Sequence, residues 1–160
     1  MASDTSNLTH LGSSSTNYNY DAPSAEIIET FANPHLGRKF VIGLDCFEFT
    51  SLCPMTGQPD YGKVWIDYIA DQLCVESKSL KLYTVAYRNH GAFHEDCVNQ
   101  IANDIISKIS PIAIRVFGDF NVRGGIAIKP MVFEYAEGLS SGDITRIDSL
   151  YASFDRISGR

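Results

Sequence analysis

The residues with the clearest chemical potential are a cysteine and an aspartate seven positions apart, Cys53 and Asp60, in the segment CPMTGQPDY. A thiolate nucleophile needs an accessible position and surroundings that lower its pKa, and a nearby carboxyl group can protonate a developing product anion. The pair therefore suggests covalent catalysis by Cys53 with Asp60 as proton donor. On these two residues alone, a buried loop cysteine beside a turn-forming aspartate is the commoner arrangement.

Three cationic residues suggest a phosphate site. Lys78 and Lys81 lie three apart in ESKSLKLY and share one face if that segment is helical, while Arg123 precedes two glycines in VRGGI. The alternatives are a solvated helix face and an ordinary turn arginine. No G-x-G-x-x-G motif follows a strand, so a nicotinamide cofactor would not occupy a Rossmann site.

An acidic residue opens a further segment, FHEDC. Glu95 could accept two parallel hydrogen bonds from the ring N–H and the exocyclic amine of a guanine-like base. The alternative is that Glu95 and Asp96 complement the positive end of a helix dipole, and that His94 is a capping or packing residue.

The cysteines do not predict a metal site. Cys46, Cys53, Cys74 and Cys97 form no C-x-x-C pair, and no histidine pair completes a zinc pattern. We expect no metal, and a small buried thiol is the default for each cysteine.

These residues must be positioned by the elements around them. Residues 1–25 are rich in Ser, Asn and Thr, which predicts a flexible tail. Alternating apolar residues predict a strand over 39–49 and another over 64–69, with a loop at 53–61 that contains two prolines and a glycine. An antiparallel hairpin is the simplest arrangement of the two strands.

Two helices follow. The apolar pattern of residues 77–88 fits helix and strand almost equally, and we choose helix. Residues 94–109 form a clearer amphipathic helix that Pro111 stops. Its apolar residues recur at steps of three and four, at Val98, Ile101, Ile105 and Ile109.

The last strands are predicted at 113–122 and 125–132, joined by Arg123 and Gly124 in a tight turn. The order is then ββααββ, which predicts an α+β fold: one antiparallel sheet with two helices on one face. Its other face would expose apolar side chains, and oligomerisation would cover them. We assign this domain to residues 26–137, and a C-terminal segment with a weak helical pattern to 138–160.

Composition sets broader limits. A chain of 160 residues with 44% hydrophobic residues predicts one globular domain. No apolar run is long enough to span a membrane, and the N-terminus lacks the pattern of a signal peptide, so we expect a cytoplasmic protein. The net charge of −6 argues against nucleic acid as a partner but allows a local basic patch that binds a phosphorylated ligand.

Taken together, the segments CPMTGQPD, ESKSLKLY, FHED and RGGI closely resemble the 7-cyano-7-deazaguanine reductases, the nitrile reductases of queuosine biosynthesis. The resemblance covers residues 29–131. It implies the tunnelling fold, a ββααββ unit that assembles into rings, with a decamer of two pentameric rings as the expected form.

The resemblance also implies roles for the candidate residues. Cys53 would attack the nitrile carbon of 7-cyano-7-deazaguanine to form a thioimide, and Asp60 would protonate the nitrogen. The base would be held by Val75, Glu76, Ser77, His94 and Glu95, and NADPH would be received by Lys78, Lys81 and Arg123, across a subunit boundary.

One cysteine pair lies outside this scheme. Cys97 stands two residues beyond Glu95, and we hypothesise that it forms a reversible disulfide with Cys53 under oxidation. Mass spectrometry after peroxide treatment tests the linkage.

Other functions remain open on the sequence alone. Water can hydrolyse a thioimide, so a cysteine-dependent nitrile hydrolase is the strongest rival. Such an enzyme would not oxidise NADPH. A non-catalytic member of the fold that binds a purine or pterin is a second rival, and it would tolerate the loss of Cys53. A zinc-dependent cyclohydrolase is disfavoured by the residue types.

Overall fold

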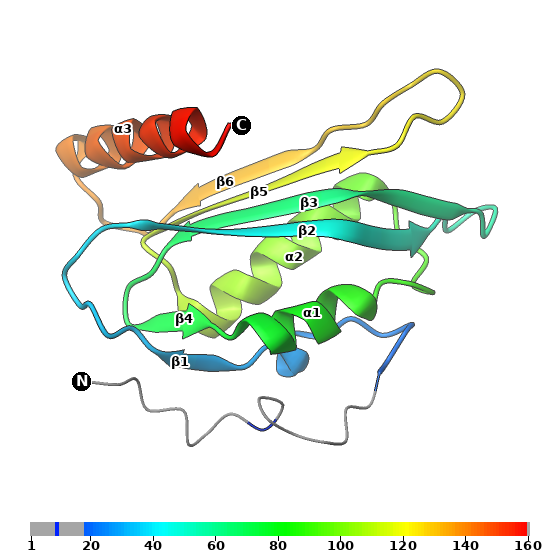
Figure 1. Cartoon of the computed structure of the whole chain (residues 1–160), viewed down its shortest axis with the longest axis horizontal. Coiled ribbons are helices and arrows are strands. Elements are labelled where there is room, and N and C mark those ends of the chain that lie inside the picture. Colours follow the sequence, from blue (N-terminus) through cyan, green and yellow to red (C-terminus); the bar gives the residue numbers. More distant parts are fainter. Residues whose placement is uncertain (1–8, 10–17, 160) are drawn as a thin grey trace.

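The computed structural model describes residue 9 and residues 18–159. Figure 1 shows a sheet with two helices on one face and a third helix on the other. The strands are β1 (Thr30–Ala32), β2 (Val41–Leu52), β3 (Pro59–Ile69), β4 (Leu73–Val75), β5 (Ala113–Phe120) and β6 (Met131–Tyr135). The helices are a 3-10 turn η1 (Ala25–Ile27), α1 (Ser77–Val85), α2 (His94–Ile109) and α3 (Ser141–Ser158).

The main sheet confirms the predicted ββααββ order. Its four strands run in the order β2-β3-β5-β6, and every neighbouring pair is antiparallel. Alternate residues of β3 point to opposite faces, as the pleat requires. Val64, Ile66 and Tyr68 are buried in the main core beneath the helices, whereas Trp65 and Asp67 point to the other face.

The two central helices are formed where the sequence predicted them. α2 spans the predicted residues 94–109, and its apolar stripe is buried. It ends at Ser110, which takes a left-handed conformation with φ 41° immediately before Pro111. α1 confirms the choice of helix for residues 77–88, but it ends at Val85 because the next residues form turns.

Two predicted boundaries are wrong near the candidate site. β2 continues to Leu52 instead of ending at residue 49, and β3 begins at Pro59, opposite Leu52, so the loop is shorter than the predicted 53–61. Pro59 is tolerated there because it is the first residue of its strand.

The strand predicted at 125–132 is also wrong. Arg123 and Ile126 close a two-residue turn in which Gly124 and Gly125 have φ values of 57° and 82°. The chain then continues without regular strand pairing to Pro130, which has no N–H for a ladder, and β6 begins only at Met131.

Two features were not predicted. β1 and β4 form a small separate antiparallel sheet beside α1. In addition, α3 covers part of the sheet face that we expected to be exposed, because Ile147 and Tyr151 pack on Ile69 and Ala113.

α3 also approaches the sheet at a glycine. A Cβ at Gly43 would lie 2.6 Å from Cζ of Phe154, so a larger residue there would require the Phe154 ring to shift. Beyond α3 the same sheet face still exposes apolar side chains such as Met131.

The tail predicted at residues 1–25 falls largely outside the described residues and stays a prediction. Among the residues described, no helix is long and apolar enough to cross a bilayer.

Candidate functional site

Cys53 lies in a tight loop between the two longest strands. Its N–H donates to the carbonyl of Gln58 (2.9 Å), and its own carbonyl accepts from the N–H of Gly57 (2.8 Å). The thiol is partly exposed. Hydrogen bonds lower the pKa of Cys53 from 9.0 to about 7, first from the Thr56 hydroxyl, then from the backbone of Met55 and Thr56, and last from Arg123.

The other three cysteines lack this character. Burial raises the pKa of Cys46 and of Cys97 to about 11, and it also raises the pKa of Cys74. Only thiolates are good nucleophiles, so Cys53 is the reactive thiol at neutral pH. Cys97 is buried, all four cysteines are free, and its pairing with Cys53 stays a prediction.

Asp60 is buried beside the Cys53 loop and contacts a guanidinium and an imidazole. Its Oδ1 lies 2.7 Å from Nη1 of Arg123, and its Oδ2 lies 3.3 Å from Nε2 of His94. Nη2 of the same arginine donates to Oε1 of Gln58 (2.8 Å). Arg123 therefore joins the turn after β5 to the loop that carries Cys53.

His94 brings the start of α2 to the same place. Its ring stacks on Phe120, with centroids 4.0 Å apart and planes 16° from parallel. Nε2 is buried and, within residues 18–159, makes no hydrogen bond, since its contact with Asp60 has poor geometry. A buried polar atom without a partner is rare, and it indicates a group that binds here.

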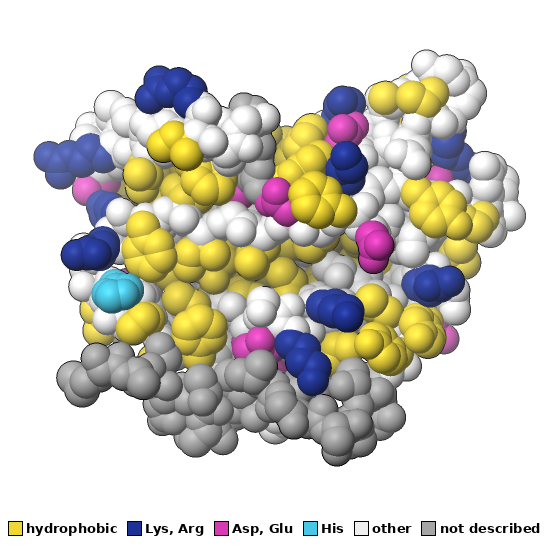
Figure 2. Space-filling model, viewed as in Figure 1, with side chains coloured by type: hydrophobic (Ala, Val, Ile, Leu, Met, Phe, Trp, Pro, Cys, Tyr) yellow, Lys and Arg dark blue, Asp and Glu magenta, His cyan; other side chains and the backbone are white. Residues whose placement is uncertain are grey.

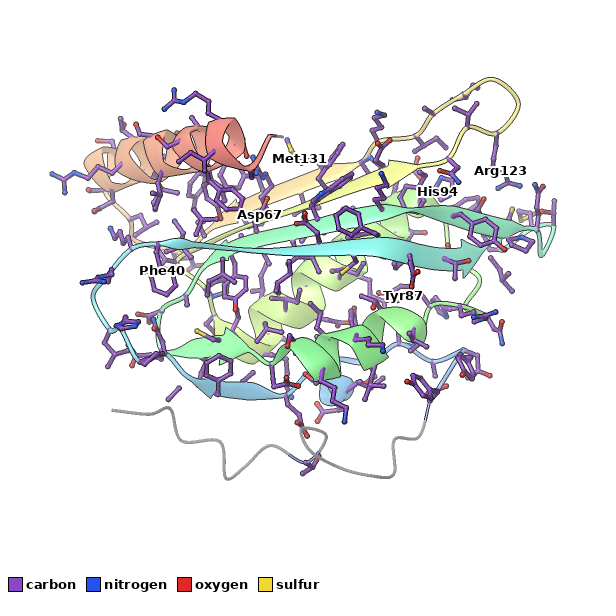
Figure 3. All side chains as sticks on the ribbon, in the orientation of Figure 1. Phe40, Asp67, Tyr87, His94, Arg123 and Met131 are labelled. Atoms are coloured by element: carbon purple, nitrogen blue, oxygen red, sulfur yellow. The ribbon has the colours of Figure 1, made fainter. Side chains whose placement is uncertain are left out.

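These contacts gather four of the predicted residues at one end of the sheet: Cys53, Asp60, His94 and Arg123. Figure 3 shows His94 and Arg123 at that end, away from Asp67, which lies nearer α3. Glu95 follows His94 on α2 and is exposed.

The remaining predicted residues lie at the start of α1. Glu76 caps this helix, because its carboxylate accepts from the backbone N–H of Lys78 (2.8 Å) and of Ser79 (2.7 Å). The N–H of Val75 donates to the hydroxyl of Tyr68 (3.0 Å), and Ser77 is exposed.

Within one chain the two groups are separated by the length of α1. The connection from α1 to α2 pairs with the end of β2: Leu52 donates to the carbonyl of His90 (3.0 Å) and accepts from Ala92 (3.1 Å). The end of α1 therefore lies near Cys53, and its start lies about 13 Å farther along the helix axis, given 1.5 Å per residue. The structure does not bring Val75, Glu76, Ser77 and Lys78 to Cys53.

A groove of about 1230 Å³ lies between β2 and α1. Of the residues predicted to hold a cofactor, Lys81 lines this groove, and Lys78 and Arg123 do not. The groove is large enough for an extended ligand.

Sequence reasoning missed three contributors to the site: Thr56, Gln58 and Phe120. Thr56 stands three residues after Cys53 in a loop with proline and glycine, a position from which a hydroxyl commonly bonds within a turn, so this signal was present. The role of Phe120 depends on strand register and had no local signal. Within the described part of the chain, no three His, Cys, Asp or Glu side chains could hold a metal ion.

The arrangement suits nucleophilic attack on an electrophilic carbon. A partly exposed thiol with a pKa near 7 lies in the same loop region as a buried carboxylate that can move a proton.

Comparisons with known proteins agree with this chemistry. The family described as "QueF-like protein" matches residues 59–138. The chain is 52% identical over 124 residues to the NADPH-dependent 7-cyano-7-deazaguanine reductase of Streptococcus thermophilus (strain ATCC BAA-491 / LMD-9), covering 78% of this chain and 76% of that protein. It is 52% identical over 124 residues to the reductase of the same name from Bacillus subtilis (strain 168), covering 77% and 74%.

A solved structure supports the fold. The archaeosine synthase QueF-Like in its apo form matches with a TM-score of 0.55 and 17% sequence identity, covering 62% of this chain and 96% of that one. This likeness shows a shared architecture, the tunnelling fold.

Proposed function

This chain belongs to the family of NADPH-dependent 7-cyano-7-deazaguanine reductases, and from that membership we propose that it reduces the nitrile of 7-cyano-7-deazaguanine to the primary amine 7-aminomethyl-7-deazaguanine in queuosine biosynthesis. The observation that carries the mechanism is the pKa of Cys53, which hydrogen bonds lower to about 7. A thiol of that kind is a ready nucleophile at neutral pH.

Cys53 begins the reaction by attacking the nitrile carbon. As the S–C bond forms, one π pair of the C≡N group moves to the nitrogen, which takes a proton and gives a thioimide. Asp60 lies in the same loop region and can accept the thiol proton and return it to the nitrogen. A bound NADPH would supply one hydride to the thioimide carbon, after which the S–C bond breaks, the Cys53 thiolate is released and an imine remains. A second NADPH would supply the hydride that, with a proton, converts this imine to the amine.

His94 and Glu95 hold the base on the Cys53 side. The buried Nε2 of His94 can form a hydrogen bond that no described residue makes with it. The exposed carboxylate of Glu95 can accept hydrogen bonds from the ring N–H and the exocyclic amine of a guanine-like base. Both residues open α2, so a base bound there lies beside Asp60.

Val75, Glu76 and Ser77 reach the base from a second copy of the chain. This follows from the length of α1 that separates them from Cys53 within one copy. The proposed assembly is a ring-shaped homo-oligomer, a decamer of two pentameric rings. The uncovered part of the sheet face, with Met131, supports such an assembly.

The chain's residues fit a phosphorylated cofactor. Lys81 lines the long groove beside α1, and Lys78 and Arg123 supply further cations near its two ends. Cationic partners favour NADPH over NADH because of the additional 2′-phosphate. A cytoplasmic location is also part of the proposal, because all four thiols are free and a reducing compartment keeps them so.

The test is consumption of NADPH by the purified protein when 7-cyano-7-deazaguanine is supplied. Two NADPH should be oxidised for each base converted, because nitrile to amine takes two hydrides. Release of ammonia with no NADPH consumed would indicate a hydrolase instead.

A further inference from the structure

The groove beside α1 has one wall made by a single helix face. Ser77, Lys81, Thr84 and Arg88 line it and recur at steps of three and four residues, so they share one side of α1 and of the turn that follows. The facing wall is the edge strand β2, with Tyr61 and Lys63 of β3 behind it. The two walls lie side by side in Figure 1.

One end of this groove reaches the candidate active site. Leu52, Pro59 and Asn121 also line it. Leu52 directly precedes Cys53, Pro59 directly precedes Asp60, and Asn121 lies two residues before Arg123. A long ligand in the groove can therefore present one end at Cys53 while the rest lies along α1.

Three cations in the groove have no acidic partner among the residues that the structure describes. Among residues 18–159, no carboxylate lies within 4.0 Å of the charged groups of Lys63, Lys81 or Arg88. By contrast, Lys129, outside the groove, pairs with Asp119 at 3.0 Å. The groove lining holds these three cations and two carboxylates, Asp45 and Glu48, so it carries a small positive excess in a chain whose net charge is −6, and this excess favours an anionic ligand. Figure 2 shows Lys and Arg side chains over α1 on this side of the molecule.

Exposed aromatic rings accompany the cations. Phe47 and Tyr61 line the groove and are 61% and 57% exposed. Nζ of Lys63 lies 5.8 Å from the centre of the Phe47 ring. The guanidinium carbon of Arg88 lies 5.9 Å from the centre of the Tyr20 ring. Flat apolar rings beside cations suit a ligand that has both an aromatic base and phosphates.

We propose that Lys63 and Arg88, with Lys81, bind the phosphates of NADPH along this groove, and that Phe47 or Tyr61 stacks on its adenine. The proposal rests on the proposed reductase function and extends it, because it places the cofactor's phosphates on two residues that no motif indicated. The nicotinamide end then lies toward Leu52 and Pro59, next to Cys53.

The test is a titration of the full-length protein with NADPH in the absence of the nitrile. The fluorescence of the reduced nucleotide reports binding. Lys63→Ala and Arg88→Ala should each weaken NADPH binding about tenfold, as expected for the loss of one charged hydrogen bond. Lys129→Ala is the matched control, since it removes an exposed lysine outside the groove, and its affinity should stay within about twofold of the unaltered protein. Added 2′,5′-ADP should displace NADPH from the unaltered protein.

Equal NADPH affinity in the unaltered protein, Lys63→Ala and Arg88→Ala would overturn the proposal, as would an equal loss in Lys129→Ala. Circular dichroism confirms that the variants are folded. The mass adduct between Cys53 and the nitrile base needs no cofactor, so it tests the reductase function independently of the groove assignment. If the adduct forms while the groove variants bind NADPH normally, the groove assignment fails and the reductase function stands; if the unaltered protein forms no adduct, the reductase function itself fails.

Discussion

At the scale of single residues, the loop from Cys53 to Gln58 explains why one thiol out of four is reactive. The Thr56 hydroxyl is the largest cause of the lowered pKa of Cys53, ahead of the backbone N–H groups and of Arg123. The same loop leaves the sulfur partly exposed, whereas burial keeps the other thiols protonated.

Replacing Thr56 by alanine should raise the pKa of Cys53 from about 7 toward the ordinary thiol value of 9.0, because the thiolate loses its strongest hydrogen bond. Alkylation by iodoacetamide follows the thiolate, so its pH midpoint should rise and its rate at pH 7 should fall several-fold. Thr56→Ser keeps the hydroxyl and should retain most of the lowered midpoint. An unchanged midpoint in Thr56→Ala would contradict this cause.

Asp60 should be needed for turnover but not for the reactivity of Cys53. Asp60→Asn keeps the size of the side chain and removes its ability to carry a proton, so kcat should fall by about 10²-fold or more, the usual contribution of general acid–base catalysis. The alkylation rate of Cys53 at pH 7 measures whether the thiol is intact. A variant with normal kcat would exclude Asp60 as the proton carrier.

Sequence reasoning identified these residues separately but not how they meet. Cys53 and Asp60 are seven residues apart in the sequence, and one hairpin places both at the same end of the sheet. The contact of Asp60 with His94 and Arg123 depends on the register of β3 against β5 and on where α2 begins, which no local pattern specifies. The sequence also did not reveal that Glu76 uses its carboxylate as a helix cap.

At the scale of elements, the strength of the hydrophobic period decided what could be predicted. α2 has a clear apolar stripe and was predicted correctly. β6 was misplaced because the chain after Gly125 has the composition of a strand but not its regular pairing. β1 and β4 were missed because each has only three residues and they pair across some forty positions of sequence, which local periodicity does not register.

The docking of α3 depends on an ionic cluster on the sheet. Arg115 contacts the buried Asp67 (2.7 Å) and Asp155 of α3 (2.6 Å), and its guanidinium lies 5.1 Å from the ring of Tyr151. Asp155→Asn should therefore lower the free energy of unfolding by about 1 kcal/mol, the upper range for a partly exposed pair. Thermal or urea unfolding measures it, and Arg146→Gln, at an exposed position of the same helix, is a control for a change of charge on α3.

This contribution should depend on pH. The Arg115 guanidinium holds the pKa of Asp155 below its ordinary value of 3.8 in the folded protein. The stabilisation is thus present above that ordinary value and is lost as the pH falls through the lower, folded value. The difference in stability between the unaltered protein and Asp155→Asn should be constant near neutral pH and should shrink below about pH 4. A difference that grew on acidification would contradict the assignment.

At the scale of the whole molecule, the separation of the two groups of site residues predicts that the active site needs two copies of the chain. Cys53→Ala and Glu76→Gln should each be nearly inactive, but mixed oligomers that contain both should regain activity, because some sites then combine an intact Cys53 with an intact Glu76 from the neighbour. Activity of the mixture after subunit exchange is the measurement. Exchange shown by mass spectrometry without recovery of activity would place the whole site in one chain.

The most direct test of the central claim is the mass of the purified protein after incubation with 7-cyano-7-deazaguanine without NADPH. Covalent attack predicts an added mass equal to one whole molecule of the base, since addition of a thiol to a nitrile releases nothing, and peptide mapping should locate it on Cys53. Cys53→Ser should show neither the adduct nor turnover. A protein that gained no mass, or a serine variant that reduced the nitrile as fast as the unaltered protein, would contradict covalent catalysis by this thiol.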